Sequence, residues 1–301
     1  MRRARLAITL GDPRGVGPEI VTKALADSEV RELCAAVLVG PTGAGVDVDE
    51  SIGVWTPARG EPAAGRFAGL AIERAVALAL DGTVDGIVTA PIDKHALLLG
   101  GYDDPGHTEL LARLTGSRTA MMLASDRLRV VLATTHLPLR DVARALSREA
   151  LLDAARLTSE ALRAWFAIPA PRIALCALNP HAGDRGRFGD EDDTLLAPVA
   201  REAGLHGPFP ADTVFVRALR GEFDAVIAPY HDVGMTAIKV ASFGEAVNVT
   251  LGLPFPRTSP DHGTAMDIAG KGVADPSSMV RAIVMCAQIV RTGAGRALEK
   301  R

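Results

Sequence analysis

Three histidines close to the ends of short apolar runs could place imidazoles around one metal ion. His136, His181 and His231 each stand within a few residues of such a run. Neutral imidazole is the commonest transition-metal ligand in proteins, and three of them can hold a catalytic metal while leaving coordination positions open. The spacing alone does not separate this interpretation from unrelated hydrogen-bonding or capping roles, since most histidines are not ligands. Both interpretations stay open on the residues alone.

A second group of residues has the chemistry of an anion site. His107 lies in the turn 105–109, which leads into a predicted helix, so its ring could face a ligand at the start of that helix or could simply cap it. Lys239 and Arg257 supply fixed positive charge of the kind that binds carboxylate or phosphate. Each could instead be one partner of a surface ion pair.

These residues are connected to apolar runs rich in Val, Ile and Leu that lack polar alternation. Such runs are typical of strands buried on both faces of a parallel sheet. Helical stretches are predicted over 64–80 and 151–166, the second with apolar residues recurring along one face. Strands alternating with helices predict an α/β fold. The predicted strands are 6–10, 35–39, 86–89, 130–133, 173–177 and 225–228.

Nearly every predicted strand ends in a polar cluster. In open α/β sheets, ligands bind outside the carboxyl ends of the strands, where loops and helix N-termini converge. We therefore expect the chemistry at one edge of a sheet or in a cleft between two sheets. The Gly- and Pro-rich segment 40–65 is expected to be a long surface excursion. The clusters lie at 11–13, 89–91, 134–136, 179–181 and 229–231.

Composition excludes several classes of protein. The formal charge of −3 is spread along the chain, which argues against a nucleic-acid-binding surface. The first apolar run, Leu6–Leu10, is too short for a signal peptide or a membrane span, so we expect no membrane association. The cysteines, Cys34, Cys176 and Cys286, show no paired spacing and are interpreted as reduced thiols of a cytoplasmic protein.

Two glycine-containing segments could approach a cofactor. The turn 11–19 follows the first predicted strand, but it lacks the G-x-G-x-x-G spacing of a dinucleotide-binding fingerprint. A tight strand-to-helix turn explains it equally well. The segment 248–278 is denser in polar residues and glycine, which is typical of a functional loop.

Seven motifs occur in order from about residue 5 to about residue 290, and together they closely resemble the 4-hydroxythreonine-4-phosphate dehydrogenase family. This resemblance implies two α/β domains that flank an active-site cleft, as in isocitrate and isopropylmalate dehydrogenases. It implies a cofactor-side domain over 1–118 and 243–301, and a metal- and dimer-side domain over 119–242. It also implies a homodimer whose subunits share the site. The motifs lie at 8–13, 105–109, 134–139, 179–183, 207–212, 230–232 and 261–265.

The resemblance also assigns roles to individual residues. A divalent metal (Zn, Co, Mg, Mn, Ni or Fe) is implied at His136, His181 and His231, which favours the metal interpretation of these residues. Substrate contact is implied for His107, Thr108, Lys239, Asn248 and Arg257. The segment 262–270 looks like the adenosine-binding loop of the related dehydrogenases, which implies cofactor contacts at Gly263, Thr264, Ala265, Asp267 and Ile268.

The implied reaction is NAD-dependent oxidation of 4-phosphohydroxy-L-threonine, a small phosphorylated hydroxy acid, with loss of its carboxylate as carbon dioxide to give 3-amino-2-oxopropyl phosphate. NAD is expected rather than NADP, because the carboxylate of Asp267 would repel a 2′-phosphate. Lys239 and Asp232 are the expected catalytic residues. Lys239 is also expected to fix an anionic end of the substrate. Asp232 is expected to orient a ligand histidine or relay a proton, although a simple hydrogen-bond acceptor is an equal alternative.

The sequence departs from the family pattern close to the implied ligand, at two single positions and over the stretch 235–238. Val233 stands where the family has glutamine, and Arg185 adds a charge where glycine is usual. Related substrates are therefore alternatives: D-erythronate or D-threonate 4-phosphate, or an aromatic cis-dihydrodiol carboxylate. Two alternatives of other classes are a three-histidine metal hydrolase and a non-catalytic binding module. Both leave the segment 262–270 unexplained.

Overall fold

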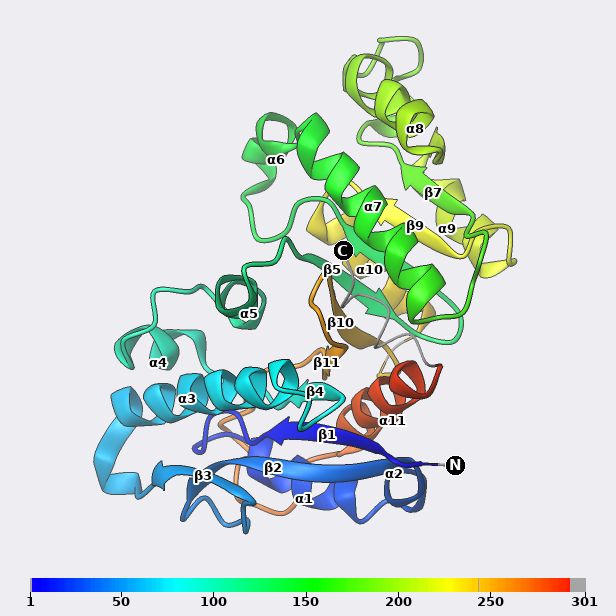
Figure 1. Cartoon of the computed structure of the whole chain (residues 1–301). Coiled ribbons are helices and arrows are strands. Elements are labelled where there is room, and N and C mark those ends of the chain that lie inside the picture. Colours follow the sequence, from blue (N-terminus) through cyan, green and yellow to red (C-terminus); the bar gives the residue numbers. More distant parts are fainter. Residues whose placement is uncertain (1, 243, 293–301) are drawn as a thin grey trace. The chain divides into compact units, whose positions relative to one another are not determined.

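The computed structural model describes residues 2–242 and 244–292, and these form two compact units (Figure 1). Unit 1 comprises the described residues of Met1–Ser117 and Val247–Arg301, and unit 2 comprises those of Arg118–Ala246. The chain thus leaves unit 1 once and returns to it for the last strands and the last helix of the described residues. No described helix is long and apolar enough to span a membrane.

Unit 1 contains six strands in the order β3-β2-β1-β4-β11-β10. Neighbouring strands pair in parallel except for β10, which runs antiparallel to β11. The parallel strands β1, β2 and β4 are buried over most of their length, which explains their continuous apolar sequence. The strands are β1 (Ala4–Thr9), β2 (Cys34–Thr42), β3 (Glu50–Val54), β4 (Gly86–Thr89), β10 (Val247–Leu251) and β11 (Arg257–Ser259).

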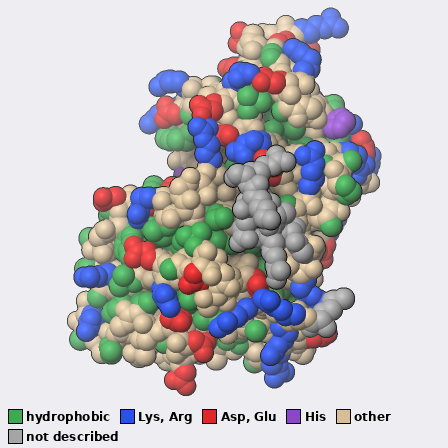
Figure 2. Space-filling model, viewed as in Figure 1, with side chains coloured by type: hydrophobic (Ala, Val, Ile, Leu, Met, Phe, Trp, Pro, Cys, Tyr) green, Lys and Arg blue, Asp and Glu red, His purple; other side chains and the backbone are tan. Residues whose placement is uncertain are grey.

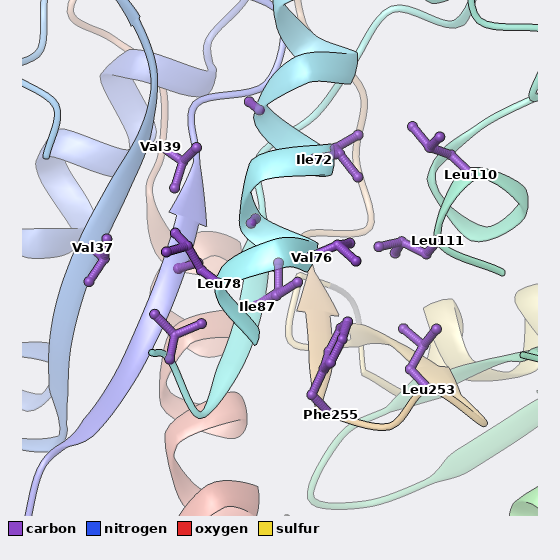
Figure 3. Packing of buried hydrophobic residues seen from close by; sticks show 14 residues of the cluster. Val37, Val39, Ile72, Val76, Leu78, Ile87, Leu110, Leu111, Leu253 and Phe255 are labelled. Carbon is purple, nitrogen blue, oxygen red and sulfur yellow. The ribbon is translucent and has the colours of Figure 1, made fainter. Parts of the chain in front are cut away.

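Helices cover the unit 1 sheet, and one of them, α3 (Gly60–Leu80), contributes five residues to its buried apolar cluster. The apolar face of α3 contributes Ile72 and Val76, which pack with Val39 of β2 and Ile87 of β4 in one buried cluster (Figure 3). The helices of unit 1 are α1 (Gly17–Leu25), α2 (Ser28–Leu33), the short η1 (Pro57–Arg59), α3 (Gly60–Leu80), α4 (Lys94–Leu99), α5 (His107–Thr115) and α11 (Ser277–Arg291).

Unit 2 contains five strands in the order β5-β6-β9-β7-β8. The pair β5–β6 is antiparallel, and the pairs β6–β9, β9–β7 and β7–β8 are parallel. The strands are β5 (Ala120–Ala124), β6 (Arg129–Leu132), β7 (Ile173–Cys176), β8 (His206–Phe209) and β9 (Ala225–Ala228).

The helices of unit 2 pack around these strands, and the buried apolar cluster of this unit includes Val130, Val226 and Ile238. The amphipathic α7 begins with a side-chain cap, since Ser147 accepts a hydrogen bond from the backbone N–H of Ala150. The helices are α6 (Leu139–Ala145), α7 (Arg148–Ala164), the short η2 (Pro180–Gly183), the π-helical η3 (Asp192–Leu196), α8 (Ala197–Ala203), α9 (Ala211–Leu219) and α10 (His231–Ala241).

All six strands and both helices predicted from the sequence are present, with ends displaced by up to a few residues. The prediction for 40–65 was partly wrong. This segment contains β3 and the start of α3, and it is anchored by the edge-to-face contact of Trp55 and Phe67. Basic and acidic side chains intermingle on the face shown in Figure 2, in agreement with the absence of a concentrated basic run in the sequence.

Candidate active site

Arg257, the first residue of β11, is a buried cation in unit 1. Its side chain donates to the hydroxyl oxygens of Thr250 and Thr89, at 2.9 Å for Thr250, and the residue is only 1% exposed. Among the described residues it has no carboxylate within ion-pair distance, and its Nε–H has no hydrogen-bond partner. Burial lowers the pKa of its guanidinium to about 9. The charge of Glu109 raises this pKa but does not offset burial, so the ionised form stays disfavoured and an anionic ligand would be favoured there.

His107, the first residue of α5, lies close enough to Arg257 for the guanidinium charge to affect the pKa of its imidazole. Burial lowers the pKa of the imidazole well below its ordinary value, and the charges of Arg257 and Lys94 lower it further. The ring is therefore neutral. It forms a hydrogen bond with the backbone of Ala90, just after β4, while its buried Nε2 has no partner among the described residues. Both side chains thus bond to residues at the carboxyl end of β4, because Arg257 contacts Thr89 and His107 contacts Ala90.

This environment of His107 predicts an acid-sensitive stability. Because the folded-state pKa is depressed, the unfolded chain takes up a proton below about pH 6.5 that the folded imidazole does not. Stability should therefore fall as the pH is lowered below that value. In His107→Gln this part of the fall should disappear, as measured by thermal unfolding between about pH 8 and pH 5. An identical pH dependence in the variant would contradict the neutral, buried state of His107.

The remaining predicted substrate contacts lie in both units. Thr108 follows His107 in α5 and is partly buried, and Asn248 lies on β10 opposite Ser259 of β11. These two residues belong to unit 1 together with Arg257. Lys239 lies in the last turn of α10 in unit 2 and is exposed. Unit 1 therefore contains four of the five predicted substrate contacts.

The predicted cofactor loop, Gly263–Ile268, is attached to the turn between β1 and α1. The backbone N–H of Val16 donates to the carbonyl of Thr264 at 2.9 Å. Gly15 lies so close to Thr264 that a Cβ atom would come within 2.8 Å of it, so only glycine fits there. Ala265 has a φ of 42°, which is unusual for a residue other than glycine and is most often seen at functional turns. Asp267 is exposed, so its carboxylate can reach a ligand.

Two of the predicted metal ligands meet in unit 2 because their strands are neighbours. His136 follows β6 and His231 follows β9, and these strands pair in parallel, so both residues leave the same edge of the sheet. The Thr134 hydroxyl donates to the carbonyl of Pro229 at 2.7 Å and ties the two loops together. The ring centres of His136 and His231 are 5.4 Å apart.

The donor groups of this pair fit a metal ion. Two imidazoles bound to one ion at about 2.1 Å cannot have ring centres more than about 6 Å apart, and the observed separation is within that limit. The Nδ1 of His231 lies 2.7 Å from Oδ1 of Asp232. Because an ionised carboxylate only accepts, His231 donates from Nδ1 and keeps the lone pair of Nε2 for a ligand.

His181, the third predicted ligand, lies in the short η2 after β7, a strained loop whose backbone is not helical at His181 and Ala182. It has a φ of 55°, and the neighbouring residues Ala182, Asp184 and Arg185 also have positive φ. Such conformations are unfavourable by about 1–3 kcal/mol each and tend to cluster at functional sites. The described residues contain no group of three His, Cys, Asp or Glu side chains arranged around a common metal position. In the structure, His136 and His231 are therefore in contact, and His181 is not grouped with them around one metal position.

Sequence reasoning missed two residues that shape these sites. Lys94 lies near enough to lower the pKa of His107, and it follows the polar cluster at the end of β4 that the sequence did reveal. Asp192 is 1% exposed and accepts from the backbone N–H groups of Leu178 and Asn179, at 2.8 and 2.9 Å, three and two residues before His181. Nothing in the local sequence distinguishes this buried carboxylate from its acidic neighbours.

Comparison with known proteins identifies the family. The model of the pyridoxal phosphate biosynthetic protein PdxA matches residues 19–286. The chain belongs to this family. It is 43% identical to the 4-hydroxythreonine-4-phosphate dehydrogenase of Desulforapulum autotrophicum, with 98% of each chain covered. The crystal structure of the Klebsiella pneumoniae enzyme of the same name matches with a TM-score of 0.84 at 38% identity, covering 95% of this chain and 99% of that one.

More distant similarities bear on the fold and on related activities. An isocitrate dehydrogenase from Methylococcus capsulatus shares the fold, with a TM-score of 0.51 over 98% of this chain and 87% of that one, at 14% identity. A terephthalate 1,2-cis-dihydrodiol dehydrogenase from Burkholderia xenovorans has a TM-score of 0.67 at 28% identity, over 95% and 98% of the two chains. A Bradyrhizobium diazoefficiens protein provisionally named D-threonate 4-phosphate dehydrogenase is 41% identical, over 94% and 96%. The predicted family, α/β fold and dehydrogenase class are thus confirmed.

Proposed function

We propose that this PdxA-family chain oxidises 4-phosphohydroxy-L-threonine with NAD and a divalent metal, releasing carbon dioxide and 3-amino-2-oxopropyl phosphate. One observation carries the proposal beyond family membership. Arg257 is buried beside a neutral imidazole and has no carboxylate partner among the described residues, which is the environment of an anion site. The relatives named 4-hydroxythreonine-4-phosphate dehydrogenase support the identity of that anion.

The residues of unit 1 bind and orient the substrate in this proposal. Arg257 neutralises an anionic end, and neutral His107 presents an unused ring nitrogen to the same ligand. Thr108 and Asn248 add neutral hydrogen-bonding groups that fix its orientation. A largely dehydrated arginine forms stronger hydrogen bonds to an anion than an exposed one.

The residues of unit 2 hold the metal and handle protons. His136, His181 and His231 are the proposed ligands, and the strained loop has to bring the His181 ring toward the other two. A divalent ion bound there supplies Lewis acidity to the substrate hydroxyl and to the carbonyl that replaces it. Asp232 orients the His231 ring through its hydrogen bond, and exposed Lys239 binds an anionic group or transfers a proton.

NAD is the proposed hydride acceptor, with its adenosine half on the loop Gly263–Ile268. Exposed Asp267 accepts hydrogen bonds from the ribose hydroxyls and disfavours a 2′-phosphate by charge repulsion. In this proposal the enzyme is a cytoplasmic homodimer, with unit 1 on the cofactor side, unit 2 on the metal and dimer side, and an active-site cleft that both subunits complete.

Replacement of Asp267 by alanine should weaken NAD binding by about 10- to 100-fold and narrow the preference for NAD over NADP. The reason is the loss of two charge-assisted hydrogen bonds and of the repulsive carboxylate. NADH and NADPH affinities measured by fluorescence titration test this. Asp275→Ala is the matched control, because its carboxylate bonds Ser277 instead. An unchanged preference in Asp267→Ala would show that the adenosine loop is wrongly placed.

The substrate is tested by following NADH formation with added divalent metal. The four substrates compared are 4-phosphohydroxy-L-threonine, D-erythronate 4-phosphate, D-threonate 4-phosphate and an aromatic cis-dihydrodiol carboxylate. The proposal expects the highest kcat/KM for the first. A clear preference for another compound would retain the dehydrogenase chemistry and reassign the substrate.

The departures from the family pattern give the alternative substrates limited support. Val233 is partly buried and packs against the apolar cluster of unit 2, so its apolar character has a packing explanation without an aromatic ligand. Arg185 lies on the strained loop with a φ of 59° and adds positive charge near His181. Such a charge favours a phosphorylated acid over an unphosphorylated diol. The phosphorylated sugar acids are therefore the second candidate.

A further inference from the structure

Two oppositely charged side chains on α1 form hydrogen bonds with the backbone of residues 272–274, far away in the sequence. Glu19 and Lys23, one helical turn apart, form an ion pair at 2.8 Å. Glu19 accepts from the N–H groups of Gly272 and Ala274, at 3.2 and 2.8 Å. Lys23 donates to the carbonyls of the same two residues, at 2.9 and 2.7 Å. This pair, termed the α1 clamp, thus forms hydrogen bonds with both the N–H and the C=O of Gly272 and of Ala274.

The same helix also holds the other end of the segment 264–274. Val16, which caps α1, donates to the carbonyl of Thr264, and Gly15 packs against that residue. A helix rises about 1.5 Å per residue, so the two attachment points are a few residues apart on one rigid element. The segment 264–274 is therefore a loop whose two ends are both fixed to α1 and its preceding turn.

Between these two attachments the loop has few contacts of its own. Two turn hydrogen bonds stabilise it, from Ile268 to the carbonyl of Ala265 at 3.1 Å and from Lys271 to that of Ile268 at 3.2 Å. Asp267 and Met266 within it are exposed. A loop with little packing keeps a defined shape only if its ends are held, because each freed residue gains about 1–2 kcal/mol of conformational entropy.

We propose that Glu19 and Lys23 are positioning residues that fix the loop 264–274 in its NAD-binding shape before the cofactor arrives. The inference rests on the proposed function, which places the adenosine of NAD on this loop. Neither side chain touches the cofactor in this proposal. A loop that is already ordered loses less entropy on binding, and this pre-organisation tightens the complex without any added contact.

A charge swap separates the clamp from an ordinary ion pair. The double variant Glu19→Lys with Lys23→Glu keeps the net charge and the pair, but it sets an ammonium against the N–H groups and a carboxylate against the carbonyls. Amide hydrogen exchange at Gly272 and Ala274 should then accelerate by about tenfold or more, and Kd for NADH should rise by about tenfold. The kcat at saturating NAD and the KM for the phosphorylated substrate should stay unchanged, which a general loss of structure would not allow.

Two controls accompany the swap. The exchange Arg156→Glu with Glu160→Arg reverses an exposed ion pair of the same spacing on α7, and it should affect neither amide exchange nor NADH affinity. If the Glu19 and Lys23 swap does not fold, Lys23→Met removes only the two carbonyl contacts and leaves Glu19 in place. In that variant, amide exchange at Gly272 and Ala274 should also accelerate and the Kd for NADH should also rise, both by less than in the swap.

The outcomes distinguish this inference from the proposed function. Unchanged exchange at Gly272 and Ala274 in a folded swap variant overturns the clamp. If exchange accelerates but NADH affinity is unchanged, the comparison with Asp267→Ala decides. When Asp267→Ala weakens NADH binding and the swap does not, the positioning role alone is wrong. When neither weakens it, the loop does not bind the cofactor and the proposed function fails at this point.

Discussion

Replacement of His181 by alanine is expected to abolish metal binding and to lower kcat/KM by more than about 100-fold. Loss of even an outer partner of a metal ligand typically reduces metal affinity or activity by 10- to 100-fold, and loss of a ligand itself should exceed that. Calorimetric titration of the metal-free protein with Zn²⁺, Co²⁺ or Mn²⁺ measures the first effect. The assay with 4-phosphohydroxy-L-threonine measures the second.

The fold should survive this substitution, because His181 lies on a loop and outside the apolar cluster of unit 2. We therefore expect the melting temperature of the metal-free variant to stay within a few degrees of the wild type. The stabilisation that metal gives the wild type should be lost, since a ligand stabilises only the state that binds it. His206→Ala, at an exposed histidine of the same unit, is the matched control. Full activity of His181→Ala after thorough chelation would refute the metal mechanism.

The parallel strands explain why part of this site is visible in the sequence. A strand buried on both faces gives a continuous apolar run, and the carboxyl ends of neighbouring parallel strands meet at one edge of the sheet. His136 and His231 come together for this reason, because β6 and β9 are neighbours. No local sequence pattern gives the order of the strands in a sheet. The proximity of His136 and His231 could therefore be established only from the structure.

Other features depend on tertiary contacts that no local pattern encodes. The sequence showed Arg257 as a charge that either binds an anion or forms a surface ion pair. Only the structure shows it buried with two threonine hydroxyls and no carboxylate partner among the described residues. The contact of Glu19 and Lys23 with Gly272 and Ala274 likewise joins parts of the chain more than two hundred residues apart. A helical i,i+4 pair in a sequence is otherwise interpreted as ordinary surface stabilisation.

The seven-motif resemblance carried information that residue types alone did not. Three separated histidines left both metal binding and hydrogen bonding open, and the family match decides in favour of a dehydrogenase over a three-histidine hydrolase. The resemblance did not indicate how His181 is held. Buried Asp192 accepts hydrogen bonds from the peptide N–H groups of Leu178 and Asn179, shortly before His181 in the chain. Such a carboxylate can be recognised only when its burial is known.

Replacement of Arg257 by methionine should reduce kcat/KM by about 100- to 1,000-fold while leaving stability almost unchanged. Removing one partner of a buried, hydrogen-bonded charge pair typically weakens a complex by about 2–5 kcal/mol, and 100- to 1,000-fold, or about 3–4 kcal/mol, lies in the middle of that span. In the protein without ligand, the substitution has two opposing effects on the free energy of unfolding. Methionine removes a buried charge whose depressed pKa shows that its ionised form is disfavoured, but it also removes a donor to Thr89 and Thr250. We expect the melting temperature to change by less than about 5 °C.

The matched control is Arg129→Met, which removes another arginine whose pKa is lowered by burial. Arg129 lies over the ring of Phe166 in unit 2 and donates to the carbonyl of Asp224, so it has a packing role. Its loss should lower the melting temperature and leave the KM for substrate unchanged. Arg257→Lys should recover only part of the activity, because a single ammonium cannot reproduce the fork of a guanidinium. If Arg257→Met instead unfolds the protein and the lysine variant is fully active, the buried charge serves stability and the anion is bound elsewhere.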